Sequence, residues 1–583
     1  MSSPRPNAEA DAEPDAELDA ESRRKLAWLN GCGSGFAPTL AFLSAVLFSS
    51  YLAGVCGRVG FMPLDQSICF DGGWRILSGE VPLRDYVAPN GFTVHALQAL
   101  FFAVLGVNWS SYLEHAALMN AFAAAAVWLL LRQLGLGRWL AALFAGASGV
   151  VFFAPFGAPY MDTHAFAFSL AALTAAVRAT LHGDDGIRRR ASWFVGPLLA
   201  LAFFAKQIPS VFFLVPCLAL CALARTERAA TLRRMLLSLA ATALVLLLAA
   251  VASGVDFAAL RLFVLDLPAE EGARRLGYVD GVGALLRNFE DTRAKLELHS
   301  LLVVHVLGLP ALLLGLVFLP RVLREPTWRW RQALGAAALG ELLLLACLCF
   351  IALTSNDREQ GVPLVFAALG ACAAALVAVG AAVGPRAARA GRAAAFALAA
   401  LAAWDAWNFH QRVNLPRKAI DITFAERDPN AAPQRLPDEL ARMQFETPRL
   451  VTYGANDLRE LSEYLRAREG AFFLVGDASV LYGITGKPSV FPALWFHPGL
   501  TFPYPHDARF ADFEQRLLER LERFDVRTIV LEPRVWIGYP APDGQKPKAR
   551  YITLDSFPRV AQLVSERLAS ERSFGPIRVL ELR

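Results

Sequence analysis

Ionisable residues next to apolar segments are the places in this chain where chemistry is most readily located. Asp71 and Asp85 lie in the stretch from Met62 to Asn108, directly after the first long apolar segment. A charge held against a bilayer costs free energy and commonly marks a functional site. We therefore expect the chemistry to centre on this stretch.

A second group of ionisable residues lies at the ends of later apolar segments. Its members are Asp162, His164, Lys206, Asp357 and Arg358. Carboxylates can act as general bases or hold a divalent cation, while Lys and Arg can neutralise a phosphate leaving group. Together at a membrane surface, these groups suit transfer from a lipid-phosphate donor. The residues alone do not decide whether a divalent cation takes part.

The composition is that of a polytopic membrane protein. The chain has 583 residues, of which 55% are hydrophobic, and its apolar runs repeatedly reach the roughly 20 residues that cross a bilayer. The net charge of +5 comes largely from arginines between these runs, which indicates membrane orientation and not nucleic-acid binding. The cysteines show no metal-binding spacing, although Cys56 and Cys69 could pair.

Eleven apolar runs are predicted to span the membrane within a domain of residues 36–409, after a disordered cytoplasmic tail of residues 1–35. The runs cover residues 36–56, 110–131, 139–156, 163–181, 191–205, 208–224, 235–255, 300–320, 333–353, 361–384 and 393–409. One helix over 191–224 would be about 50 Å long, too long for a hydrocarbon core of roughly 30 Å. We therefore predict a hairpin that turns near Lys206 and Pro209.

Arginine placement predicts the orientation. Five loops predicted to be cytoplasmic hold 17 arginines, whereas the three short outer loops hold only Lys206 and Arg358 as basic residues. Positive residues favour the cytoplasmic side. The N-terminus is thus expected inside and the C-terminus outside.

Two long outer segments and a C-terminal domain complete the predicted organisation. The segments, which we call the first and second outer loops, cover 57–109 and 256–299, and the second is expected to form surface-lying amphipathic helices. Residues 410–583 alternate short β-prone runs with helical patterns, which predicts an extracytoplasmic α/β domain with a largely parallel sheet. Its strands are expected at 471–477, 527–533 and 577–583. The intervening Pro-, Gly- and aromatic-rich loop could bind a sugar or a partner, or could be packed structure.

The first outer loop resembles that of GT-C glycosyltransferases, in particular the bacterial group similar to protein O-mannosyltransferases and lipid A aminoarabinose transferases. The residues that carry the resemblance are Asp71, Gly79, Pro82, Arg84, Asp85 and Gly106. Three features depart from the pattern, namely Gly72 in place of the Glu of an Asp-Glu pair, Leu83 in place of an aromatic residue, and Asn90-Gly91-Phe92 in place of Gly-Pro.

The resemblance implies a GT-C membrane fold and an inverting transfer from a polyprenyl-phosphate sugar to a glycan, lipid or protein of the envelope, at the outer face of a bacterial inner membrane. It makes Asp71 the candidate base and Asp162 the second acidic catalytic residue, with Lys206 and Arg358 on the donor phosphate. The candidate substrate-binding residues are Asp85, Arg84, Lys206, Asp357, Arg358 and His164.

Each candidate also has a purely structural interpretation. Asp71 could cap a helix, and Asp85 could pair with Arg84 or Arg75. The remaining candidates also have structural interpretations at helix ends. Asp162 and Lys206 could be solvated turn residues, His164 could be a hydrogen-bonded interfacial histidine, and Arg358 could anchor the chain at the lipid head groups. Two other classes remain open: a secondary transporter, although no repeat is visible and the charges cluster outside, and a non-catalytic protein whose outer domain binds envelope polysaccharide.

Overall fold

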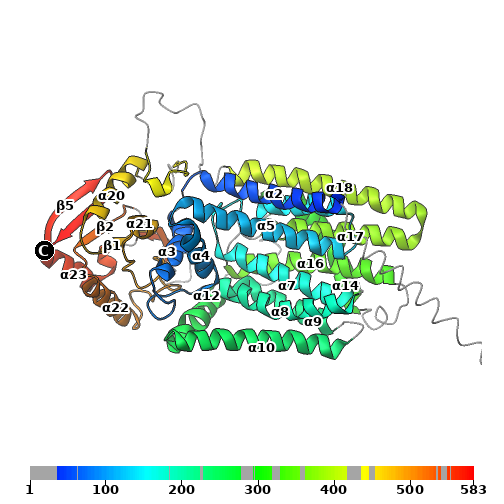
Figure 1. The fold of residues 1–583 in the computed structure, drawn as a ribbon, viewed down its shortest axis with the longest axis horizontal. Coiled ribbons are helices and arrows are strands. Elements are labelled where there is room, and N and C mark those ends of the chain that lie inside the picture. Colours follow the sequence, from blue (N-terminus) through cyan, green and yellow to red (C-terminus); the bar gives the residue numbers. More distant parts are fainter. Residues whose placement is uncertain are drawn as a thin grey trace, which may run out of the picture.

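The computed structural model shows a helical body joined end to end with a smaller domain that contains the sheets (Figure 1). The tail, Asp357 and Arg358 lie outside the residues that the structure describes. These are residues 36–61, 63–182, 184–222, 227–276, 296–317, 328–354, 362–415, 435–445, 453–533, 536–539, 548–551 and 553–583, with isolated positions between 290 and 294.

Each of the eleven predicted spans falls on a helix of the body. The helices are α2 (Phe36–Arg58), α5 (Trp109–Gln133), α6 (Arg138–Val151), α7 (Met161–Leu181), α8 (Asp185–Ala205), α9 (Gln207–Ala222), α10 (Arg228–Ala252), α14 (His299–Val317), α16 (Trp328–Thr354), α17 (Val365–Val383) and α18 (Pro385–Phe409). Within the described residues, six are long and apolar enough on their own to cross a membrane: α2, α5, α7, α10, α16 and α17. In addition, α6, α9 and α14 are shorter and apolar.

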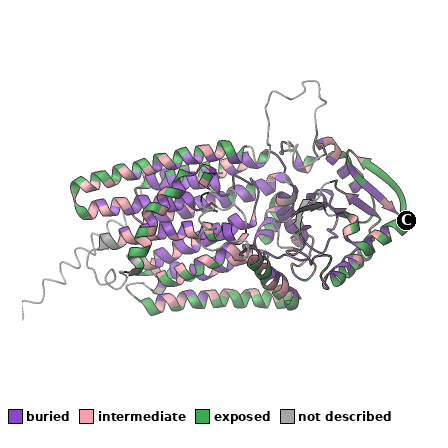
Figure 2. Cartoon of the chain, turned by 180° about the vertical axis from the view of Figure 1, so that it is seen from behind, coloured by how far each residue is buried: buried purple, intermediate pink, exposed green. Residues whose placement is uncertain are grey.

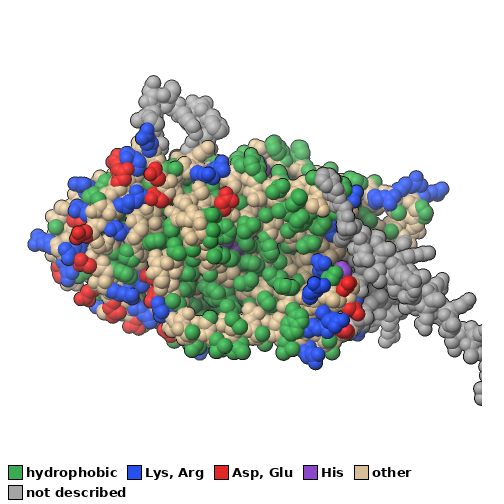
Figure 3. Space-filling view, viewed as in Figure 1, with side chains coloured by type: hydrophobic (Ala, Val, Ile, Leu, Met, Phe, Trp, Pro, Cys, Tyr) green, Lys and Arg blue, Asp and Glu red, His purple; other side chains and the backbone are tan. Residues whose placement is uncertain are grey.

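The surface of the helical body is that of a lipid-facing protein. Leucines and valines of α10 point outward, and Leu248 and Val251 are each 58% exposed. Figure 3 shows a band of hydrophobic side chains between the charged smaller domain and a cluster of Lys and Arg at the far end of the body. Such a band belongs in hydrocarbon. The prediction of a helical multi-pass membrane protein is confirmed.

The chain breaks at the predicted hairpin between α8 and α9. Lys206 directly follows α8 and is extended, with φ −165° and ψ 133°, and Ile208 is also non-helical. Helix α9 packs against both α7 and α8. The two apolar halves are therefore separate neighbouring helices, as predicted, and Lys206 lies in the turn between them.

Both outer loops contain helices in their described parts. The first forms α3 (Pro63–Leu77) and α4 (Thr93–Leu105). These helices approach so closely that a Cβ on Gly72 would lie 2.1 Å from Nδ1 of His95, so only glycine fits there. The second loop forms α11 (Phe257–Leu260), a π-helical turn (Arg261–Asp266) and α12 (Leu267–Leu276), which agrees with the predicted helical character.

The C-terminal domain has a four-stranded sheet in the order β1-β2-β6-β5 and a separate two-stranded sheet of β3 and β4. Three helices, α20, α22 and α23, accompany the larger sheet in the smaller domain, and α21 precedes the long loop. The bounds are α20 (Ala455–Ala467), β1 (Phe472–Val475), α21 (Val480–Thr485), α22 (Phe510–Arg523), β2 (Thr528–Leu531), β3 (Trp536–Tyr539), β4 (Lys548–Tyr551), α23 (Pro558–Arg567), β5 (Leu568–Phe574) and β6 (Ile577–Leu582).

The prediction of a largely parallel sheet is wrong. Among the described strands of the four-stranded sheet, β1 and β2 pair in parallel, while β6 is antiparallel to both β2 and β5. Helix α23 ends at Arg567, and the chain directly enters β5. A two-residue turn with Gly575 at φ +53° then joins β5 to β6, and strands joined so tightly must be antiparallel.

The C-terminal domain packs directly on the first outer loop. One apolar cluster contains Phe70 and Trp109 from the loop region together with Tyr482 and Leu494 from the domain. Val87 and the segment Pro492–Leu494 add backbone hydrogen bonds, including one from Val87 N to Pro492 O of 2.9 Å. Figure 2 shows buried residues on both sides of this junction. The loop and the domain therefore form one continuous core at one end of the helical body, which we call the domain end.

Candidate functional site

Asp71 lies inside α3 with its side chain completely buried. Arg75, one turn later, donates from Nε to the carboxylate at 2.8 Å, and the hydroxyl of Ser489 in the C-terminal domain donates to its other oxygen. Burial raises the pKa of Asp71, while Arg75 and Ser489 oppose that rise. Because Asp71 lies in the interior of α3, the interpretation as a helix cap is wrong.

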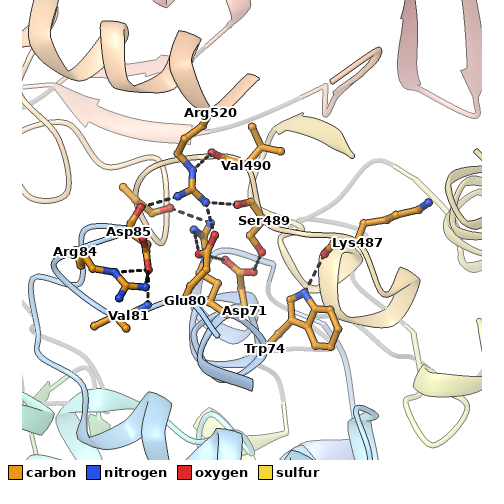
Figure 4. A network of polar contacts seen from close by, with 12 residues as sticks. Asp71, Trp74, Glu80, Val81, Arg84, Asp85, Lys487, Ser489, Val490 and Arg520 are labelled. Carbon is orange, nitrogen blue, oxygen red and sulfur yellow. Dashed lines mark hydrogen bonds and ion pairs between the residues drawn. The ribbon is translucent and has the colours of Figure 1, made fainter. Parts of the chain in front are cut away.

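The ion pair of Asp71 belongs to a larger network that joins the loop to the domain (Figure 4). Arg75 also binds Glu80 at 3.2 Å, and Glu80 in turn pairs with Arg520 of α22. Arg520 donates further to the carbonyls of Ser489 at 2.6 Å and Asp85 at 2.7 Å. Removing one partner from such a network would leave a buried charge uncompensated. The network therefore fixes the first outer loop beneath the C-terminal domain.

Asp85 and Arg84 pair with each other, as one of their structural interpretations predicts. Asp85 accepts hydrogen bonds from Arg84 Nη2 at 2.6 Å and from Val81 N at 2.7 Å. Burial acts to raise the pKa of Asp85, but these bonds outweigh it and the pKa is lowered. Arg84 also donates to the carbonyl of Ser253 at 3.1 Å, just beyond the end of α10. The pair thus ties the loop to the end of that helix.

Lys206 and Asp162 form an ion pair at the domain end of the body. Asp162 lies in the first turn of α7 with its side chain fully buried, whereas the side chain of Lys206 keeps 21% exposure. The ammonium also lies 5.5 Å from the ring centroid of Phe350. A buried carboxylate thus holds a cation that solvent or an anion can still reach. The structure brings these two predicted site residues together.

Asp65 is a candidate that the sequence analysis missed. It lies in the first turn of α3 and is half-buried, and Tyr160, next to α7, donates its hydroxyl to Asp65 Oδ1 at 3.4 Å. Burial raises the pKa of the Cys69 thiol, and the charges of Asp162 and Asp65 raise it further. Both carboxylates therefore lie near Cys69. A signal was present, because Asp65 is the first acidic residue after the first span.

The C-terminal domain contributes two more carboxylates near this group. Asp477 and Glu532 follow the parallel strands β1 and β2, and Asp477 N donates to Glu532 at 2.6 Å. Burial raises the pKa of Asp477, as do the charges of Glu532 and Asp65. Carboxyl ends of parallel strands are common ligand sites. No cluster of three or more metal-ligating side chains occurs within the part of the chain that the structure describes.

His164 is a satisfied buried histidine. Its Nδ1 lies 2.7 Å from the carbonyl of Tyr160 and its Nε2 lies 3.1 Å from Nε2 of His115. These contacts agree with the structural interpretation of His164, and its role in substrate binding stays a prediction. Cys56 and Cys69 are not joined to each other, so the disulfide considered between them is not formed.

The fold and these residues define a multi-pass membrane protein with an acid- and cation-bearing site where its helical body meets a mixed α/β domain. Searches against protein-family models and curated proteins give no match. Among solved structures, the chain is similar to ArnT from Cupriavidus metallidurans, with a TM-score of 0.48 for its apo state and 0.43 for its complex with undecaprenyl phosphate. Each similarity covers 94% of this chain and 98% of ArnT at 11% identity. At that level of similarity, this chain's own residues must carry the functional argument.

Proposed function

We propose that this protein is a GT-C membrane glycosyltransferase that moves a sugar from a polyprenyl-phosphate donor to a glycan, lipid or protein acceptor at the outer face of a bacterial inner membrane. The observation that carries the proposal is the Lys206–Asp162 pair, which holds a reachable cation at the domain end of the spans. Tyr160, two residues before Asp162, donates its hydroxyl to Asp65. The resemblance of the first outer loop to that family supports the same function.

The proposed mechanism assigns the cation to the donor and a carboxylate to the acceptor. Lys206 neutralises the charge that develops on the departing polyprenyl phosphate. An acceptor hydroxyl attacks the anomeric carbon from the opposite face, the bond to the phosphate oxygen breaks, and the carboxylate takes the hydroxyl proton. This order inverts the anomeric centre.

Two carboxylates compete for the role of base. Asp71 is the one predicted from the sequence, and that assignment stays a prediction. The buried contacts of Asp71 with Arg75 and Ser489 favour a positioning role for it. We therefore propose Asp65, which is half-buried and contacts Tyr160 at the start of α7, as the group that takes the proton.

A transfer assay tests the proposed function. The full-length protein in lipid nanodiscs is given undecaprenyl-phosphate-linked pentoses and hexoses, together with an envelope extract as acceptor, and free undecaprenyl phosphate is measured by mass spectrometry. We expect one donor to be consumed and its carrier released, with the extract required. If every donor in the panel remains intact, the protein is not a transferase of this type.

The proposed orientation has its own test. An alkaline phosphatase fused after Arg583 should be active, because the arginine-rich loops favour the cytoplasmic side and the domain lies at the opposite end of the body (Figure 3). The same enzyme fused after Gly135, between α5 and α6, should be inactive, and green fluorescent protein should show the reverse pattern. Activity at Gly135 with silence at Arg583 would mean that the orientation is inverted.

A further inference from the structure

A second site candidate is a cleft between the first outer loop, α11 and α22. It has a volume of about 500 Å³, within the range of roughly 300–1,000 Å³ that small-molecule sites occupy. Neither Lys206 nor Asp162 lines it. Five arginines do: Arg84, Arg509, Arg516, Arg520 and Arg523. The cleft is therefore separate from the proposed transfer site and is rich in groups that bind anions.

Three of the five arginines in the cleft are already paired with carboxylates. Arg84 pairs with Asp85, and Arg520 pairs with Glu80. Arg509 pairs with Asp507 at 2.6 Å. The acidic residues of the lining are Asp85, Asp256, Asp512 and Glu519. Asp256 caps α11, Glu519 accepts a hydrogen bond from Gln515, and Asp512 is exposed and forms no ion pair with a residue that the structure describes.

Arg516 and Arg523 are exposed on α22 and take part in no ion pair with any residue that the structure describes. They are seven residues apart, which places them on the same face of the helix, two turns from each other. An anion between them would receive donors from both guanidinium groups. Among the arginines of the cleft, these two are therefore the ones available to bind an anion.

The cleft lies where the chain leaves the apolar band, since Asp256, Ala258 and Ala259 line it just after α10. Arg84 donates to the carbonyl of Ser253, directly after α10, and the last turns of α10 expose Leu248 and Val251. On the next segment, Phe257 and Leu265 are exposed as well. Exposed apolar side chains on an amphipathic segment beside a span lie at the membrane interface. An anion attached to acyl chains would reach the arginines without leaving the bilayer surface.

We propose that this cleft binds the phosphate-bearing head group of a membrane lipid, with Arg516 and Arg523 as its donors. The planar guanidinium group matches phosphate geometry and binds it through two parallel hydrogen bonds. The apolar side chains of the following segment would contact the acyl chains. This binding does not depend on sugar transfer, so it can be measured in the absence of any sugar donor.

The test uses the full-length protein in detergent and dioctanoyl phosphatidic acid as the probe, with binding measured by titration calorimetry. We expect Arg516→Gln with Arg523→Gln to weaken binding by about tenfold or more, since each lost charge-assisted hydrogen bond is worth on the order of a tenfold change. Rising salt should weaken the wild-type interaction. The affinity of the variant Arg516→Lys with Arg523→Lys should lie between those of the wild type and the glutamine variant, because the charge remains while the bidentate geometry is lost.

A matched control is Arg527→Gln with Arg567→Gln, two exposed arginines of the same domain that do not line the cleft. This variant should bind like the wild type, and all variants should share its thermal midpoint. Unchanged binding by the Arg516/Arg523 variant would refute the site. Equal loss in the control would show non-specific charge attraction, and equal affinity for inorganic phosphate would show that no lipid is recognised; either result overturns the proposal.

Discussion

Replacing Asp65 by Asn should lower sugar transfer by about 10²–10⁴-fold, the usual effect of losing a general base. The amide keeps the shape of the side chain and can still accept the hydroxyl of Tyr160, so the first turn of α3 should remain folded. It cannot take a proton from the acceptor. Turnover of the wild type and the variant is compared in nanodiscs under saturating donor, with the thermal midpoint measured on the same samples.

Asp71→Asn is the matched control, since it makes the same change six residues later in the same helix. This change leaves Arg75 buried with only Glu80 as an ion partner, and breaking a buried pair typically costs about 3–5 kcal/mol of stability. We expect a lower thermal midpoint with transfer per folded molecule within about tenfold of the wild type. Should Asp71→Asn abolish transfer at an unchanged midpoint while Asp65→Asn stays active, the assignment from the sequence is right and ours is wrong.

The choice between these two aspartates shows what the sequence could not decide. Six residues along a helix correspond to a rotation of about 240°, so Asp65 and Asp71 lie on different faces of α3. The face that meets the C-terminal domain is fixed by Ser489, which is 418 residues away from Asp71. A motif of the first outer loop contains no information on that contact. The position of Asp65, as the first acidic residue after the first span, was a better guide to which carboxylate remains partly exposed.

Features that depend on local sequence were predicted well. The helices of the body coincide with the apolar runs, and the turn at Lys206 followed from the length of a bilayer core. The pairing of β5 with β6 was not predicted, because the helical pattern at residue 567 continues into the strand without an interrupting residue. The ion pair between Lys206 and Asp162 joins the turn after α8 to the first turn of α7. The sequence was enough to identify both residues as candidates. Their contact could not be predicted, because it depends on how α7 packs against α8.

Lys206→Met should lower transfer by at least about 10²-fold if the ammonium meets the departing phosphate, since removing one preorganised charge-stabilising donor typically costs about 10²–10³ in rate. Lys206→Arg keeps a positive charge and should retain much more activity than the methionine variant. The measurement is turnover and donor affinity on the full-length protein in nanodiscs. A fall in turnover larger than the loss of donor affinity would place the interaction in the transition state.

The simplest competing explanation is that Lys206 only neutralises Asp162, which is fully buried. Lys206→Met alone would then lower both stability and transfer, because it leaves a buried charge uncompensated. The double variant Lys206→Met with Asp162→Asn removes both charges and separates the two explanations. If Lys206 were only a structural counter-ion, restoring neutrality would restore both the thermal midpoint and transfer. We expect the midpoint to recover while transfer stays low, because no cation then remains to meet the phosphate.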